Sequence, residues 1–441
     1  FLAESVQLGP NIFLDILVGY IIKGLIIEDY SKLGDYALGT AETGRINKLG
    51  VLAIKARAAL YWASPLFNQS NDASRWTNAA KYYKELVDEC TSKGMKLTDK
   101  YQDLWDTNNY SNEKISQEIV FARRVAGANN VAETNNYPVG IEGGKGGNCP
   151  SQNLVDAYCM ANGKAITDPE SGYDPAKPYD NRDPRLALTV AYNGTQWPTY
   201  AGAPLLETFV GGANGLPLSG ATTTGYYLKK LCHGSIDLSA NGKYKSDFHT
   251  YVLFRLGGIY LDYAECLFIL NGENDATAWA LLDELRNRAF GNLEVGHADE
   301  LTAKFLPFYQ NLAQKYGRTA ITEYPIPFNT ATVNVTPAKT NYTNLKAAKG
   351  FGDCPVWKIA VNEERRKEFC SEWCLRPDMQ RSGYLKYQVE YNYPKQDKTS
   401  DELRDWPWSN RNYDYQEQKM DMPIPAGELT KNKLCDQNPG Y

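Results

Sequence analysis

The sequence predicts a mostly α-helical protein, built from paired helices with long loops and small β elements on one side. Apolar residues recur at steps of three and four in separate segments, which is the period of a helix. Residues 127–250 are instead rich in Gly, Asn, Pro, Thr and Tyr, a composition typical of loops. At 441 residues, 43% of them hydrophobic and 22% charged, the chain is globular but too long for one simple core.

A first helix pair is predicted within residues 46–91. The first helix spans 46–64, because Pro65 disfavours a helical conformation in the residue before it. The second spans 76–91, with Asp72 or Ser74 as its N-cap.

A second pair is predicted at residues 251–270 and 276–290, joined by a turn at Asn271 and Gly272. Small residues at the crossing points of both pairs are typical of tetratricopeptide-like (TPR-like) units. A further helix is predicted at 361–376, ahead of Pro377, and residues 12–27 read as an amphipathic helix too short to span a bilayer.

Short strands are predicted at 119–123 and 186–191, and residues 292–358 and 390–420 are predicted to be irregular. The glycine cluster at 143–147 lacks the spacing of a phosphate-binding loop and reads as a flexible loop. We therefore expect three parts: an N-terminal TPR-like part at 1–126, a loop-rich ligand side at 127–250, and a C-terminal TPR-like part with inserted loops at 251–441. Together they form one intertwined domain.

Composition and missing motifs exclude several functions. With 47 basic and 52 acidic residues, the chain lacks the excess of positive charge that is typical of nucleic-acid-binding proteins. Nine scattered cysteines without a CxxC, and three distant histidines, predict buried free thiols and no metal site. No nucleophile, zinc or dinucleotide motif occurs, so we predict no catalytic residue and no cofactor. A glycoside hydrolase stays open, because sequence spacing cannot show whether two carboxylates converge.

Several segments, in order, resemble the SusD/RagB family of Bacteroidetes nutrient-uptake lipoproteins. They are KARAALYWASPLFN (55–68), SQEIVFARR (116–124), PSQNLVDAYCMANGKAI (150–166), SGYDPAKPYDNRDPRL (171–186), TGYYLKK (224–230), FRLGGIYLDYAECL (254–267), LLDELRNRAF (281–290), ERRKEFCSEWCLRPDMQRSG (364–383) and MPIPAGELTKNKLCDQNPGY (422–441). The resemblance implies that this chain lacks the N-terminal part of that family.

The resemblance implies a cell-surface binding protein, not an enzyme, that covers a SusC-like TonB-dependent outer-membrane transporter. It would pass oligosaccharides, or in some systems peptides, into that barrel. The membrane anchor would be an N-terminal lipid upstream of this chain. The arginines of the matching motifs are expected to tie helices and loops together; they are Arg182, Arg185, Arg365 and Arg366.

The chain is unusually rich in aromatic residues, with 31 Tyr, 9 Trp and 14 Phe, and the candidate ligand-binding residues are chosen from these. A sugar binds by laying its C–H face on a ring while polar side chains take its hydroxyls. The loop candidates are Trp197, Tyr200, Trp105, Tyr110 and Tyr137, with Trp406 and Trp408 as second choices. The helical tryptophans are instead predicted to be core: Trp62, Trp76, Trp279 and Trp373. Capture of a peptide, or a TPR-like groove that binds another protein, stays open.

Overall fold

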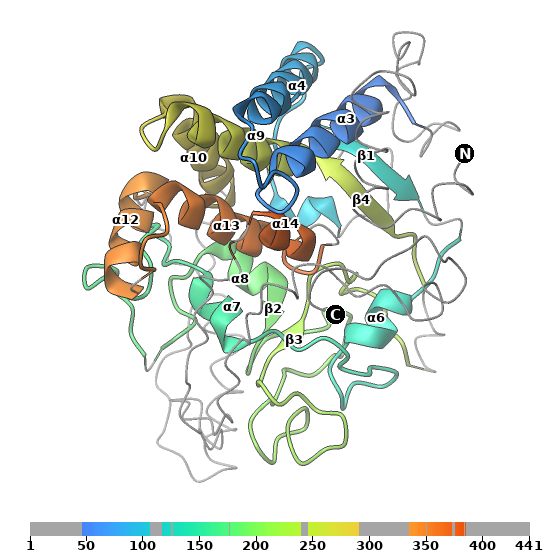
Figure 1. The fold of residues 1–441 in the computed structure, drawn as a ribbon. Coiled ribbons are helices and arrows are strands. Elements are labelled where there is room, and N and C mark those ends of the chain that lie inside the picture. Colours follow the sequence, from blue (N-terminus) through green and yellow to red (C-terminus); the bar gives the residue numbers. More distant parts are fainter. Residues whose placement is uncertain are drawn as a thin grey trace, which may run out of the picture.

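The structure, a computed structural model, describes residues 46–105, 117–124, 127–175, 177–239, 246–290, 335–349, 351–372, 375–382 and 384. Most of the long helices gather on one side of the molecule together with one small sheet, and loops with short helices and a second small sheet form the other (Figure 1). The predicted mostly α-helical architecture is confirmed.

The helical side contains two antiparallel pairs and a third group. The pairs are α3 (Lys48–Ala63) with α4 (Ala73–Ser92), and α9 (Leu256–Asn271) with α10 (Ala276–Phe290). The third group is α12 (Ala338–Lys349), α13 (Val356–Glu368) and α14 (Leu375–Arg381). A short 3₁₀ helix, η2, spans Tyr101–Leu104. Among the described residues, no helix has both the length and the apolar character needed to cross a membrane.

Local sequence sets the helix ends. The side chain of Asn47 accepts a hydrogen bond from the backbone N–H of Gly50 at 2.8 Å and so caps α3. Asp72 caps α4 by accepting from the N–H of Ser74 at 2.9 Å, which confirms it as the N-cap. Gly272, with a φ of 85°, ends α9 in a conformation that favours glycine.

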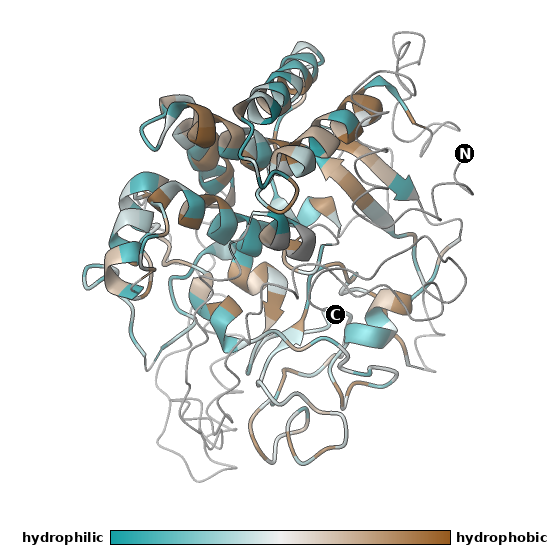
Figure 2. Cartoon of the chain, viewed as in Figure 1, coloured by the Kyte–Doolittle hydropathy of each residue, from teal (hydrophilic) through white to brown (hydrophobic). Residues whose placement is uncertain are grey.

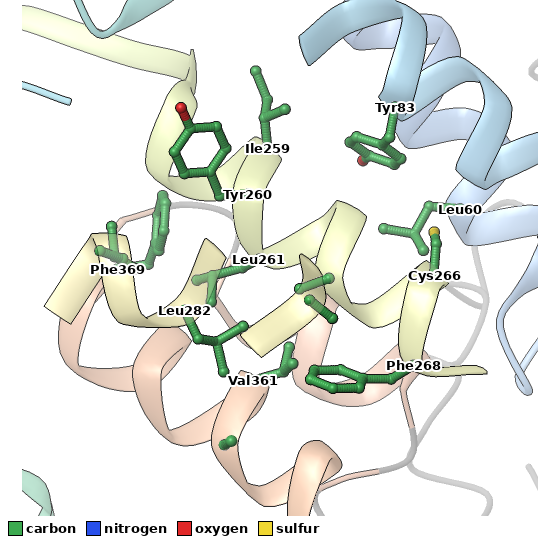
Figure 3. Close-up of a cluster of buried hydrophobic side chains, with 14 of the residues drawn as sticks. Leu60, Tyr83, Ile259, Tyr260, Leu261, Cys266, Phe268, Leu282, Val361 and Phe369 are labelled. Carbon is green, nitrogen blue, oxygen red and sulfur yellow. The ribbon is translucent and has the colours of Figure 1, made fainter. Parts of the chain in front are cut away.

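One hydrophobic core joins helices from distant parts of the sequence. Figure 3 shows Leu60 of α3 and Tyr83 of α4 beside Cys266 of α9, and Val361 of α13 near Phe268. Trp76 and Trp279 belong to this core as predicted, whereas Trp62 is only partly buried and Trp373 lies outside the described residues. The proposed part boundaries after residues 126 and 250 stay a prediction.

Two small antiparallel sheets complete the fold. Strand β1 (Ile119–Arg124) pairs with β4 (Thr250–Arg255), and β2 (Val190–Ala191) pairs with β3 (Tyr227–Leu228). Three one- to two-turn helices lie among the loops: α6 (Val131–Asn136), α7 (Gln152–Ala157) and α8 (Pro184–Thr189).

Four of the segments predicted from the sequence differ from the structure. The helix predicted at 251–270 begins only at Leu256, because the residues before it pair as β4. Of the strand predicted at 186–191, residues 186–189 belong to α8. The helix predicted at 361–376 begins at Val356 and ends at Glu368. Pro377 lies in the first turn of the next helix, α14. Proline is tolerated there, because the backbone N–H groups of a first turn have no partner within the helix. Helix α12 occupies a segment predicted to be irregular. The helix predicted at 12–27 lies outside the described residues.

Helix α13 is hydrophilic but buried, and ion pairs explain how. Figure 2 shows it as largely hydrophilic, yet Glu364 and Glu368 are completely buried. Arg185 of α8 reaches both carboxylates, at 3.1 Å each. Arg255, at the end of β4, pairs with Glu368 at 2.9 Å and with Glu118 at 3.0 Å. These pairs bind the helical side to the loops and to the β1–β4 sheet.

A second buried group of charges joins α3, α9, α13 and α14. Arg365 lies 2.8 Å from Asp262 and 3.1 Å from Asp378, and Arg381 lies 2.9 Å from Glu265. Arg182 instead donates to backbone carbonyls at the end of α7, and Arg366 pairs with a glutamate of its own helix. The role predicted for Arg182, Arg185 and Arg365 in joining separate segments therefore agrees with their contacts, whereas the ion pair of Arg366 lies within one helix.

Candidate ligand-binding surface

The β2–β3 ladder separates two aromatic clusters in the loop region. Tyr227 begins β3 and Tyr226 immediately precedes it, and the two neighbouring rings belong to different clusters. Tyr226 packs with Tyr192 on one side of the ladder. Tyr227 packs on the other side with Tyr137 and Trp197.

The first group, here the Trp197 cluster, comprises Tyr137, Trp197, Tyr200 and Tyr227. Tyr137 is completely buried, and its hydroxyl donates to the carbonyls of His233 at 2.7 Å and Ile236 at 3.0 Å. Trp197 is 5% exposed and meets the Tyr137 ring edge-on, with centroids 5.6 Å apart. These two predicted ligand residues therefore form the floor of the cluster.

Tyr200 is the more accessible member of the Trp197 cluster. It lies within loop 193–206, which is closed by hydrogen bonds between Gly194 and Leu206 at 2.7 Å and between Leu206 and Thr195 at 3.1 Å. Its ring is half-buried against the cluster. Burial raises the pKa of Tyr200, and the negative charges of Asp237 and Glu142 raise it further. A partly exposed ring thus has carboxylates in its vicinity.

The second group, here the Tyr179 cluster, comprises Tyr179, Tyr192, Tyr226 and Gln152. Tyr179 is half-buried and stacks on Tyr192 with centroids 4.0 Å apart and planes 15° apart. Its hydroxyl donates to Tyr226 at 3.2 Å, and Tyr226 donates to the amide oxygen of Gln152 at 2.7 Å. The ring is therefore held in one orientation beside a polar amide.

Tyr179 is not among the candidates predicted from the sequence, although its place beside a family-like motif could have identified it. Tyr179 immediately precedes the Asp-Asn-Arg-Asp-Pro-Arg run of the family-like motif. Arg182 from that run is buried and donates to the carbonyls of Pro178, Val155 and Tyr158, at 2.5, 2.7 and 2.8 Å. A structural arginine three residues away fixes the backbone that carries the ring.

Trp105 lies in a different place from these two clusters. It packs edge-on against Tyr101, with centroids 4.8 Å apart, next to residues of β1. The ammonium of Lys230 lies 5.5 Å from its ring centroid. Tyr110, Trp406 and Trp408 lie outside the described residues. For all seven candidates, contact with a ligand stays a prediction.

The polar residues of the described regions do not assemble a metal centre: no group of three or more His, Cys, Asp or Glu side chains there is arranged to hold an ion. The cysteines described in the structure carry free thiols, and all of them except the partly exposed Cys149 are buried, as predicted.

Known proteins share both the sequence pattern and the architecture of this chain. The sequence pattern of the SusD family matches residues 117–300 and 355–441, more than half of the chain. Among curated proteins, no significant sequence match exists.

Solved structures share the fold at low sequence identity. A SusD-like protein from Bacteroides fragilis has a TM-score of 0.62 at 18% identity, over 97% of this chain and 71% of its own. A SusD-like carbohydrate-binding protein from the same species has a TM-score of 0.63 at 18% identity, over 96% and 70%. Surface glycan-binding protein A from Bacteroides uniformis has a TM-score of 0.50 at 14% identity, over 97% and 68%. The chain belongs to the SusD family.

Proposed function

We propose that this protein captures oligosaccharides at the cell surface, without cleaving them, and delivers them to a SusC-like TonB-dependent outer-membrane transporter. Family membership supports the proposal, and two structural relatives are named for carbohydrate or glycan binding. Outer-membrane localisation through an N-terminal lipid anchor belongs to the same proposal. The observation that carries it is the pair of partly exposed tyrosines, Tyr200 and Tyr179, each held by a packed aromatic cluster.

The chemistry of these positions suits a saccharide. A pyranose ring presents a C–H face that packs on an aromatic ring, and hydroxyls that need hydrogen-bond partners. Tyr200 offers a ring with Asp237 and Glu142 in its neighbourhood as acceptors. Tyr179 offers a ring stacked on Tyr192, with Gln152 linked to it through Tyr226.

Affinity should be weak, because a partly open site on the surface buries little of the ligand. We expect dissociation constants between micromolar and millimolar, which correspond to roughly 4 to 8 kcal/mol. Weak capture suits a protein that must release its ligand to a transporter.

The test is calorimetry and affinity electrophoresis of the purified chain with panels of polysaccharides and of peptide mixtures. Tyr200→Ala and Tyr179→Ala should each weaken binding of the recognised glycan by about tenfold, roughly 1.4 kcal/mol. Tyr251→Ala is the matched control, because Tyr251 is 56% exposed on β4 and belongs to neither cluster, so its loss should leave affinity unchanged.

Other results would replace the proposal. Saturable binding of peptides alone would identify a peptide-capturing member of the family, which needs fewer stacked rings. Cleavage of a glycan that is abolished by replacing one Glu or Asp would identify a glycoside hydrolase. Pull-down of a TonB-dependent barrel with the lipidated full-length protein tests the transporter partner.

A further inference from the structure

Two of the three histidines in the sequence stack on each other inside the loop region. The rings of His233 and His249 have centroids 4.4 Å apart and planes 19° apart. They are 1% and 7% exposed. Against them lies Glu133, which is 0% exposed. Its Oε1 accepts the backbone N–H of His233 at 2.7 Å and lies 3.0 Å from Nε2 of His249.

These residues come from three separate segments. Glu133 belongs to α6, His233 follows β3 in the loop 231–236, and His249 immediately precedes β4. Two of these segments, those of Glu133 and His249, also meet through the backbone, where Asn129 and Asp247 form an antiparallel bridge with N–H to carbonyl distances of 2.8 and 2.9 Å. The cluster therefore lies at the junction of the three segments.

A buried carboxylate needs a positive partner. In the described part of the chain, His249 is the only side chain that forms an ion pair with Glu133. The second carboxylate oxygen of Glu133 is buried and has no hydrogen-bond partner among the described residues. An uncompensated buried charge is strongly destabilising, so the charge on His249 decides whether this contact stabilises the loops.

Both acceptors and cations lie near the stacked rings. The carbonyl of Asp247 lies 3.2 Å from Nδ1 of His249, and the Asp247 carboxylate lies 3.7 Å from Nδ1 of His233. On the paired strand β1, Arg123 lies opposite Tyr251 and is exposed, and Arg124 lies opposite Thr250. Charging both imidazoles would place two cations face to face at 4.4 Å.

We propose that Glu133, His249 and His233 form a pH-responsive latch, which fastens α6, loop 231–236 and the start of β4 together when His249 carries a proton and loosens them when that proton is lost. His233 supports the latch by stacking and by its backbone hydrogen bond. The latch lies next to the floor of the Trp197 cluster, because Tyr137 donates to the carbonyl of His233.

Protonation strengthens the latch at the lower end of the pH range. Burial lowers the pKa of His249, but the hydrogen bond and charge of Glu133 and the contacts with Asp247 outweigh it and raise that pKa above its ordinary value. A group with a raised folded pKa contributes its full stability below the unfolded value, about 6.5 for histidine. That contribution is lost as the pH rises through the raised folded pKa.

The test combines two measurements on the purified chain. NMR titration of histidine-labelled protein, assigned with His249→Gln, should show His249 titrating above the ordinary histidine value. Amide hydrogen exchange, corrected for its intrinsic pH dependence, should show protection falling in residues 129–137, 231–236 and 247–250 as the pH rises. The two must agree, because each pKa unit of increase corresponds to about a tenfold loss of protection.

Variants separate the latch from a merely packed cluster. Glu133→Gln keeps the shape of the side chain but removes its charge, so the pKa of His249 should fall back to or below the ordinary value. His233→Phe keeps the stacked ring and should preserve the pH dependence of exchange. Titration of His249 at or below the ordinary value in the wild-type protein would overturn the proposal, as would pH-independent protection of the three segments.

Discussion

Glu364 shows how single residues stabilise this molecule. Its Oε1 accepts hydrogen bonds from Tyr342 at 2.6 Å, Arg286 at 2.8 Å and Lys367 at 2.8 Å, and its Oε2 accepts from Arg185 at 3.1 Å. Burial raises the pKa of Glu364, but the cations Lys367, Arg185 and Arg286 outweigh burial and hold it well below its usual range. The carboxylate is thus charged and satisfied inside the protein.

Removing this charge should be strongly destabilising. Glu364→Gln leaves buried cations without their partner, and we expect a loss of about 3 to 5 kcal/mol in the free energy of unfolding, measured by urea denaturation. Asp88→Asn is the control, because Asp88 pairs with Lys84 on an exposed surface. The control should change stability little, and an equal loss in both variants would contradict this role for Glu364.

The sequence predicted that the motif arginines are structural but could not predict which aromatic rings face solvent. Trp197 and Tyr200 are three residues apart in the same loop, yet one is buried and the other half-buried. Burial of Trp197 depends on Gly234, where an added Cβ would lie 2.6 Å from the indole ring. Such a contact between distant segments leaves no periodic signal.

At the scale of elements, the cap of α3 can be tested directly. Asn47→Ala removes the acceptor for the N–H of Gly50, and we expect a loss of about 1 kcal/mol in thermal or urea unfolding. Asn47→Asp keeps an acceptor at the N-terminus and should retain most of the stability. If both variants lose equally, the side-chain cap is not the source of the effect.

The glycine cluster at 143–147 is a loop, as predicted, but it packs closely against the Trp197 cluster. At Gly146, φ is +60° and an added Cβ would lie 2.7 Å from Cε1 of Tyr227. Gly147 donates to the carbonyl of Asn135 at 2.6 Å. Glycine here permits close approach to a ring as well as a turn.

Gly146→Ala should therefore destabilise the loop region by about 1 to 3 kcal/mol through backbone strain and overlap with Tyr227. Near-ultraviolet circular dichroism and thermal unfolding would detect the change. Gly127→Ala is the matched control, since an added Cβ there has no atom within 4 Å. A silent Gly146→Ala variant would show that the ring can move aside.

The helical period of apolar residues predicted α3, α4, α9 and α10. It gave wrong results where contacts between distant segments determine the structure. Tyr251 to Arg255 is apolar enough to continue the helix pattern, and only pairing with β1 makes it a strand. The hydrophilic face expected of a surface helix is buried in α13, because its charges meet partners from other segments. Tertiary ion pairs of this kind are invisible to a hydrophobic pattern.

For the whole molecule, the buried carboxylates predict sensitivity to acid. Burial raises the pKa of Glu368, but Arg288, Arg255, Arg185 and Lys230 lower it to about 2 overall. The depressed value means that this group contributes stability above its unfolded pKa, near 4.3, and that the contribution is lost as the pH falls towards 2.

Thermal unfolding measured from pH 7 to pH 2 should therefore show stability falling from about pH 5 downwards, and more steeply as several buried carboxylates protonate together. High salt should weaken this dependence little, because the pairs are buried and poorly screened. A flat profile down to pH 3 would contradict a stabilising role for the buried charges.

The buried ion pairs also constrain the order in which the chain can mature. Arg185 and Arg255 both precede their shared partner Glu368 in the sequence, although each also pairs with an earlier carboxylate, Asp183 and Glu118 respectively. As the polypeptide leaves the ribosome, its first 350 residues contain both arginines but not the carboxylate of Glu368 that they share. We therefore expect the emerging chain not to fold cooperatively until α13 has been synthesised. A fragment that ends at Lys349 should lack cooperative unfolding and be degraded rapidly by protease.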